Sequence, residues 1–157
     1  MQDYPLYDIL YIMHNDFYAS GFLYHSKTQQ ILLQQQNDKD TESKWSLFIG
    51  EKLGEETEEE TFRRTIYSSL RLKLKPRAVK PIYSYFHSDK NKNNYICYAK
   101  VETLGEFENL KQKLFGWFTF KQIQKINVSE QTKQDIVVGK RVIESALRKK
   151  LGERTIG

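Results

Sequence analysis

The chain has 157 residues, of which 39% are hydrophobic and 29% charged, and its formal net charge is +5. This length and apolar fraction are enough for one core, so we expect a single domain over residues 1–157. No apolar run reaches the length of a membrane span and no basic-then-apolar leader opens the chain, so we expect a cytoplasmic protein without a membrane partner. Cys97 is the only cysteine, which excludes an internal disulfide, and its apolar surroundings predict a buried thiol.

Residues 18–36 predict two strands joined by a turn at 26–28. Apolar Phe22, Tyr24, Ile31 and Leu33 alternate there with smaller or polar side chains, a period typical of strands. A polar loop over 37–44 follows, and the run KWSLFIGEKLGE comes after it.

The segment after Glu56 predicts a helix that has Arg71 at its end. Thr57 followed by Glu60 forms a capping-box pattern, so the helix should begin immediately after Glu56, and Lys75-Pro76 should break it. Two aromatic, β-prone runs over 78–89 and 93–102 then flank a polar turn. A strand with Trp117-Phe118 precedes a short turn, and residues 129–151 predict a last helix.

The segment from Gly50 to Leu72, GEKLGEETEEETFRRTIYSSLRL, carries the most specific pattern of the chain. It resembles the Nudix box, G-x5-E-x7-R-E-U-x-E-E-x-G-U, in which U is a bulky aliphatic residue. Five positions match, namely Gly50, Glu56, Arg64, Ile66 and Leu72. Four do not: Thr65, Ser68 and Ser69 stand where the box has glutamates, and Arg71 stands where it has its late glycine.

The flanks of this degenerate Nudix box agree with the resemblance. Trp45 resembles the tryptophan that approaches the box, although Phe48 and Ile49 stand where a Pro-Gly pair is usual. The resemblance to the Nudix hydrolase superfamily covers about residues 18–150. It implies an α/β fold of the α+β kind, a Nudix-like α-β-α sandwich with a mixed central sheet.

The missing glutamates predict the loss of the metal site. Carboxylates at i, i+3 and i+4 lie on one helix face and converge on Mg²⁺ or Mn²⁺, whereas Thr65, Ser68 and Ser69 offer neutral hydroxyls. We therefore expect no catalytic residue, no metal cofactor and little or no pyrophosphohydrolase activity. Glu56 and Arg64 should still form the ion pair that ties the loop to the helix.

The resemblance implies a nucleotide or another phosphorylated small molecule as partner. We expect the chain to bind a nucleoside diphosphate derivative or to act as a binding or regulatory module. Arg71 is a candidate for gripping phosphate. Of the aromatic residues on strands or strand edges, including Tyr83 and Tyr85, we select Tyr24, Trp45 and Phe86 as candidates for stacking on a base.

Two alternatives stay open. The first is an active Nudix hydrolase of nucleoside diphosphate derivatives whose Mg²⁺ or Mn²⁺ is held by acids outside the missing triad, namely Glu51, Glu55, Glu56, Glu102, Glu106 and Glu108. The second is an RNA-binding domain built on the basic stretch from Arg63 to Lys80, which would need aromatic side chains beside that patch. A homodimer is an expectation taken from the resemblance alone.

Overall fold

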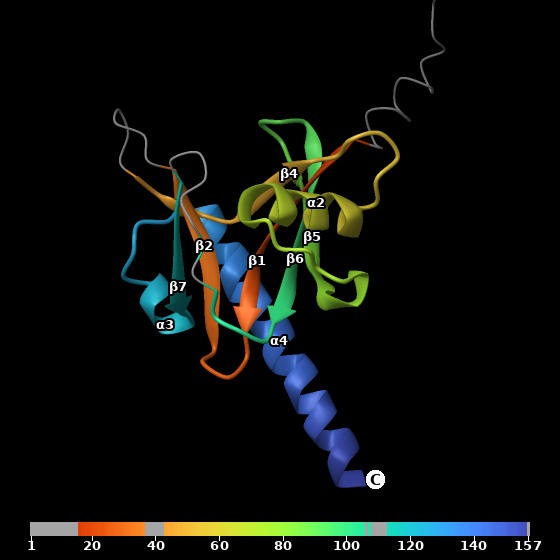
Figure 1. Ribbon diagram of the computed structural model, residues 1–157, viewed down its shortest axis with the longest axis vertical. Helices are drawn as coiled ribbons and strands as arrows, with labels where there is room; N and C mark the ends of the chain where they lie inside the picture. The colour runs from red at the N-terminus through yellow and green to blue at the C-terminus, as the bar shows by residue number, and fades with distance from the viewer. Residues whose placement is uncertain (1–15, 37–42, 106, 108–112, 157) are drawn as a thin grey trace, which may run out of the picture. The chain divides into compact units, whose positions relative to one another are not determined.

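The computed structural model describes residues 16–36, 43–105, 107 and 113–156, drawn in colour in Figure 1. The described part folds into two compact units, the first from residues 16–21 and 48–99 and the second from residues 22–47 and 100–156. Strand β1 (Phe17–His25) begins in the first unit and ends in the second. The fold is of the α+β class with a mixed sheet, as predicted, and the prediction of a single domain stays a prediction.

The strands of the first unit are joined in the order β4-β1-β6-β5. Strand β4 (Phe48–Glu51) pairs antiparallel with the beginning of β1, so that Ala19 lies opposite Gly50. Strands β5 (Val79–His87) and β6 (Lys92–Val101) form the hairpin predicted around the polar turn.

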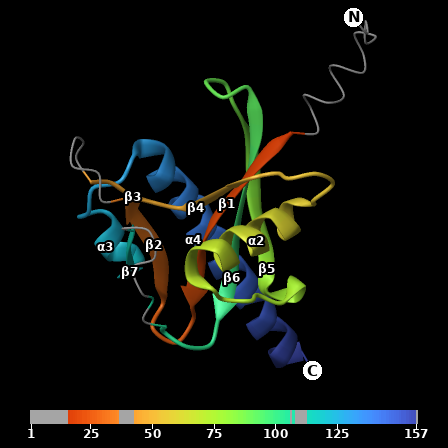
Figure 2. The same ribbon diagram turned by 45° about the horizontal axis from the view of Figure 1, so that its top comes forward.

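Helix α2 (Glu58–Leu70) is the helix of the degenerate box and lies alongside β4 and β5 (Figure 2). Its start was predicted correctly: the Thr57 hydroxyl accepts a hydrogen bond from the Glu60 backbone N–H, and the Glu60 carboxylate accepts one in return. The predicted end near Arg71 is confirmed, whereas the predicted break at Lys75-Pro76 is wrong. The helix stops at Leu70 because Arg71 turns into the left-handed region at φ 57°, while Pro76 opens a separate 3-10 turn, η1 (Pro76–Ala78).

The core of the first unit is built from one face of α2 and the facing strands. Side chains three and four apart on a helix share a face. In α2 the face that carries Phe62, Ile66 and Leu70 is apolar and packs into the core. The largest fully buried side chains of this core are Phe62 and Ile66 from α2 and Phe48 from β4, with Ile96 from β6 nearly as enclosed. Burying such side chains contributes roughly 1.5–3 kcal/mol each, which fixes α2 to the strands that carry the box loop.

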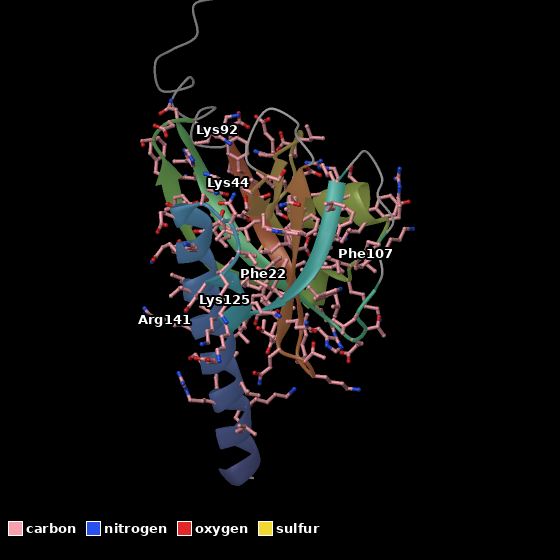
Figure 3. All side chains as sticks on the ribbon, turned by 90° about the vertical axis from the view of Figure 1, so that its left-hand side faces the viewer. Phe22, Lys44, Lys92, Phe107, Lys125 and Arg141 are labelled. Carbon is pink, nitrogen blue, oxygen red and sulfur yellow. The ribbon has the colours of Figure 1, made fainter. Side chains whose placement is uncertain are left out.

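In the second unit, β2 (Gln30–Gln36) pairs antiparallel with the end of β1, with β3 (Trp45–Ser46) and with β7 (Lys113–Thr119). The predicted turn between β1 and β2 is present. The apolar side chains are more continuous than the predicted alternation, because Leu32 is as fully buried as its neighbours in β2. Figure 3 places the fully buried Phe22 on β1 inside the protein.

Two helices complete the second unit. Helix α3 (Phe120–Ile123) is a single turn directly after β7, and it was predicted only as a turn. Helix α4 (Glu130–Ile156) extends five residues beyond the predicted end at 151. Ile136 and Ile143 are its buried positions in the predicted apolar spacing, whereas Leu147 is half exposed. No helix in the described ranges has the length and apolar character needed to span a membrane.

Candidate functional site

The ion pair predicted between the box loop and its helix is present. Nε of Arg64 donates to both carboxylate oxygens of Glu56, at 3.1 and 2.8 Å, and Nη2 of Arg64 donates to the backbone carbonyl of Glu51 at 2.6 Å. The same carboxylate also accepts from the Leu53 backbone N–H at 2.9 Å. The hydrogen bonds from Arg64 hold the pKa of Glu56 below its usual value, so the carboxylate is charged and fastens the loop to α2.

Thr65, the first of the replaced glutamates, points into the structure. Its side chain is buried and its hydroxyl donates to the backbone carbonyl of Thr61 at 2.7 Å. The backbone of Gly50 packs directly against the Thr65 side chain. The approach is so close that a Cβ added at Gly50 would overlap the Thr65 Oγ1 atom. The Thr65 hydroxyl therefore makes its hydrogen bond within α2 and is covered by the backbone of Gly50.

Ser68 and Ser69 complete the helix face where the box carries its other two glutamates. Ser68 is exposed and Ser69 half-buried on the last turn of α2. Together with Thr65 they give three neutral hydroxyl groups, one of them already bonded, and no negative charge. Mg²⁺ and Mn²⁺ require carboxylate oxygens or substrate phosphates at such a position, so these three residues do not fit a divalent metal site.

The acids outside the triad that the structure describes do not converge either. Glu51 is paired with Lys92 at the beginning of β6, Glu56 is paired with Arg64, and Glu55 is exposed. Figure 3 labels Lys92 beside the β5–β6 turn. Glu102 is exposed in the second unit, and Glu106 and Glu108 lie outside the described residues. Across the part of the chain that the structure describes, no three His, Cys, Asp or Glu side chains gather around a common point.

The four predicted ligand residues fall in different units. Tyr24 and Trp45 belong to the second unit, where Tyr24 is buried against Phe120 and Trp45 packs edge-on against Phe118. Burial and the nearby charge of Glu144 raise the Tyr24 pKa.

Arg71 and Phe86 belong to the first unit. Phe86 is more than half exposed on β5. The guanidinium of Arg71 lies 5.5 Å from the ring centre of Tyr67, one turn earlier on the same helix. Arg71 is therefore exposed and stacked on its own helix.

An apolar cavity of about 430 Å³ lies in the first unit between the start of α2 and the β5–β6 hairpin. Val79, Pro81 and Ile96 give it apolar walls, Tyr83 and Tyr95 add aromatic rings, and Glu58 and Glu59 stand at its α2 side. The Cys97 thiol also lines it and is almost completely buried, which raises its pKa and makes it a poor nucleophile. The cavity suits a flat, largely apolar ring.

Sequence reasoning missed a second depression on the outer face of α2. Its lining includes Arg63, Arg64 and Tyr67 from the helix and Lys73 from the segment after it. Tyr67 is 41% exposed, an unusual place for a large ring. The spacing of Arg63, Tyr67 and Arg71 at i, i+4 and i+8 was the signal that could have revealed it, because such residues line one helix face.

Comparisons with known proteins agree on the fold. No family model matches the sequence, and no curated protein is significantly similar to it in sequence. A MutT/Nudix family protein from Listeria innocua matches in structure at a TM-score of 0.65 and 12% identity, over 85% of this chain and 97% of that one. The Nudix domain of Shewanella oneidensis NrtR, solved with ADP-ribose, matches at 0.65 and 12%, over 81% and 87%.

A third structure, from a study of MutT of Aliivibrio salmonicida and Vibrio cholerae, matches at a TM-score of 0.61 and 12% identity, over 82% of this chain and 98% of that one. At such low identity the likeness speaks for the fold and leaves the chemistry open. With the loop, the ion pair and the helix found where the degenerate box predicts them, the chain has a Nudix-like fold.

Proposed function

We propose that this protein binds a nucleoside diphosphate derivative through its Nudix-like fold without hydrolysing it. The main support for this proposal is the set of side chains on α2 that would have to bind a metal ion. Thr65 is buried and bonded to its own helix, and Ser68 and Ser69 are neutral, where metal-dependent chemistry needs three carboxylates.

The remaining acids near the loop favour binding over hydrolysis. Glu56 is held by Arg64, and Glu51 by Lys92, so recruiting either carboxylate to a metal would leave a cation without its partner. A metal ligand must also be rigidly positioned for fast chemistry, and Glu55 lies exposed on the loop.

The cavity between α2 and the β5–β6 hairpin supports binding of a base. Apolar walls and two tyrosine rings suit a nucleobase, because its flat face gains from leaving water and from contact with aromatic side chains. The Nudix domain of Shewanella oneidensis NrtR was solved with ADP-ribose, which makes that compound a suitable first probe.

Calorimetry and product analysis test the two halves of the proposal. ADP-ribose and ADP are titrated into the protein in the presence of EDTA, and release of AMP or phosphate is then followed with Mg²⁺ or Mn²⁺. We expect binding without metal and no metal-dependent product. Turnover above about 1 per second would contradict the proposal, since that is an ordinary enzyme rate.

A matched pair of variants tests the location. Ser84→Trp places a large ring in the cavity, whereas Ser88→Trp adds the same ring at an exposed position after β5 that does not line it. Filling the cavity should weaken ADP-ribose binding at least about tenfold. The Ser88 variant should bind like the wild type. Equal affinities for the two variants would place the base elsewhere, and no binding of either probe would refute the binding function.

A further inference from the structure

The outer face of α2 combines an exposed ring with several cations. We define the Tyr67 groove by Arg63, Arg64, Tyr67, Arg71 and Lys73, of which all but Arg71 line one depression of about 410 Å³. Arg71 joins them because its guanidinium lies over the Tyr67 ring at 5.5 Å. An exposed ring beside cations is the combination that binds single-stranded nucleic acid, since bases stack on the ring and phosphates bind the cations.

Arg71 has a backbone conformation that costs free energy for a residue with a side chain. Its φ of 57° lies in the left-handed region, which glycine adopts freely and which other residues rarely occupy. The Nudix pattern has glycine at this position, so the arginine replaces the residue best suited to the backbone. Strained residues of this kind concentrate at functional sites.

The charges of the groove are only partly balanced. Arg63 donates from Nε to Glu59, and Arg64 from Nε to Glu56, so two of the cations have carboxylate partners. Glu60 also lines the depression, but its carboxylate closes the capping box at Thr57. Lys73 is exposed and has no ion-pair partner among the described residues. Arg63 uses its Nε to bind Glu59, so its Nη groups can donate to a phosphate.

Further basic residues follow the groove without intervening acids. Lys75, Arg77 and Lys80 are all exposed, and η1, which contains Arg77, contacts α2. Between Leu70 and Lys80 the sequence contains no Asp or Glu. A continuous basic stretch of this length attracts the phosphates of a strand that extends beyond one nucleotide.

We propose that the Tyr67 groove binds single-stranded nucleic acid, with a base stacked on Tyr67 and the neighbouring phosphates held by Arg71 and Lys73. The site is separate from the cavity between α2 and the β5–β6 hairpin, and it does not depend on binding of a nucleoside diphosphate derivative. Its contacts are to phosphate and to the face of a base, so they do not require the 2′-hydroxyl group.

Fluorescence anisotropy with labelled twelve-nucleotide strands of uridine and of thymidine tests the proposal. Both should bind the full chain at 50 mM salt, and both should bind tighter than a duplex of the same length. Tyr67→Ala should weaken binding at least about fivefold, because stacking on an aromatic ring is worth roughly that much or more. Tyr67→Phe should keep it. Lys73→Ala should reduce the slope of log affinity against log salt by about 0.7.

Arg71→Gly separates binding from folding. Glycine fits the left-handed backbone, so this variant should melt about 1 to 3 °C higher than the wild type while binding the strands more weakly. Arg71→Asn, which also tolerates this conformation, should lose binding to the same extent. Lys149→Ala, which removes one exposed charge from α4, serves as the matched control and should retain wild-type affinity.

Three results would overturn the proposal. The first is failure of the wild type to bind either strand at 50 mM salt. The second is equal or tighter binding of the duplex, which would mean that stacking of unpaired bases contributes nothing. The third is a loss in the Tyr67→Ala and Arg71→Gly variants no larger than the loss in Lys149→Ala, since general charge alone would then account for the affinity.

Discussion

Gly50 and Thr65 are in direct contact across the box: the glycine backbone at the end of β4 lies so close to the threonine hydroxyl on α2 that no Cβ fits between them. The hydroxyl in turn donates to the carbonyl of Thr61. The end of β4, where the box begins, thus packs on the same side chain that replaces the first box glutamate. This contact joins β4 directly to α2, beside the Glu56–Arg64 pair that fastens the following loop.

Gly50→Ala should lower the free energy of unfolding by about 1–3 kcal/mol, because the added methyl group overlaps Thr65 Oγ1 and the packed surroundings cannot move away without strain. Chemical denaturation monitored by tryptophan fluorescence measures the change. Gly152→Ala is the control, since a Cβ there meets open space within α4. It should be neutral or stabilising.

A double-mutant cycle tests whether Thr65 is the cause. In a Thr65→Ala background the overlapping hydroxyl is absent, so Gly50→Ala should cost clearly less than in the wild type. Equal costs in the two backgrounds would mean that Gly50 is required for a reason other than this contact.

The Glu56–Arg64 pair should make stability depend on acid pH. Because the folded-state pKa of Glu56 is lowered by its hydrogen bonds to Arg64, folding favours the charged form. The resulting stability is fully present above the usual glutamate value of 4.5 and is lost as the pH falls through the lower folded value. Glu56→Gln should therefore be less stable than the wild type at pH 7, and the difference should shrink as the pH falls below 4.5.

Arg64→Ala should likewise cost about 1 kcal/mol at pH 7, a figure reduced for the partial exposure of the arginine. Arg63→Ala, which removes the i,i+4 pair with Glu59, serves as the comparison and should cost less. Thermal melts of the variants across pH 3 to 7 supply both measurements. A constant gap between Glu56→Gln and the wild type over this range would contradict the assignment.

Cys97 should react with a thiol reagent only after unfolding. It is buried on β6, its thiol donates to the backbone carbonyl of Ser20 at 3.5 Å, and burial raises its pKa. Thiolate is the reactive form, so the native protein should be labelled slowly at pH 8 and completely in guanidinium. Fast labelling of the native protein would mean that the cavity it lines opens readily.

Much of the local structure followed from the sequence because short-range signals determine it. The capping residues Thr57 and Glu60 fixed where α2 begins, and the turn before Gln30 fixed the β1–β2 hairpin. The sequence predicts Arg71 at the end of α2, as found, but the predicted break at Lys75-Pro76 is wrong, because the helix already stops at Leu70 where Arg71 adopts a conformation that its residue type disfavours.

The candidate site was less predictable, because it depends on which side chains meet in space. The spacing of the box predicted the Glu56–Arg64 pair, but nothing in the sequence indicated that Thr65 would lie beneath Gly50. Tyr67 was not among the predicted ligand residues, which were sought on strands, strand edges and the end of the helix. Its exposure follows from the strands covering the opposite face of α2, and its spacing with Arg63 and Arg71 on one helix face was the available signal.

We propose that α2 resembles the Nudix box helix in its backbone and differs from it in lacking the metal-binding glutamates. The most direct measurement is the melting temperature of the wild type and of the Thr65→Glu, Ser68→Glu, Ser69→Glu triple variant, each with EDTA and with Mn²⁺. In EDTA the triple variant should melt below the wild type, because three like charges crowd one face and the side chain at 65 must displace the Gly50 loop. With Mn²⁺ it should regain stability, by about 2.7 kcal/mol at a metal concentration of 100 times the dissociation constant, while the wild type stays unchanged. An equal Mn²⁺ response in both proteins would contradict the claim.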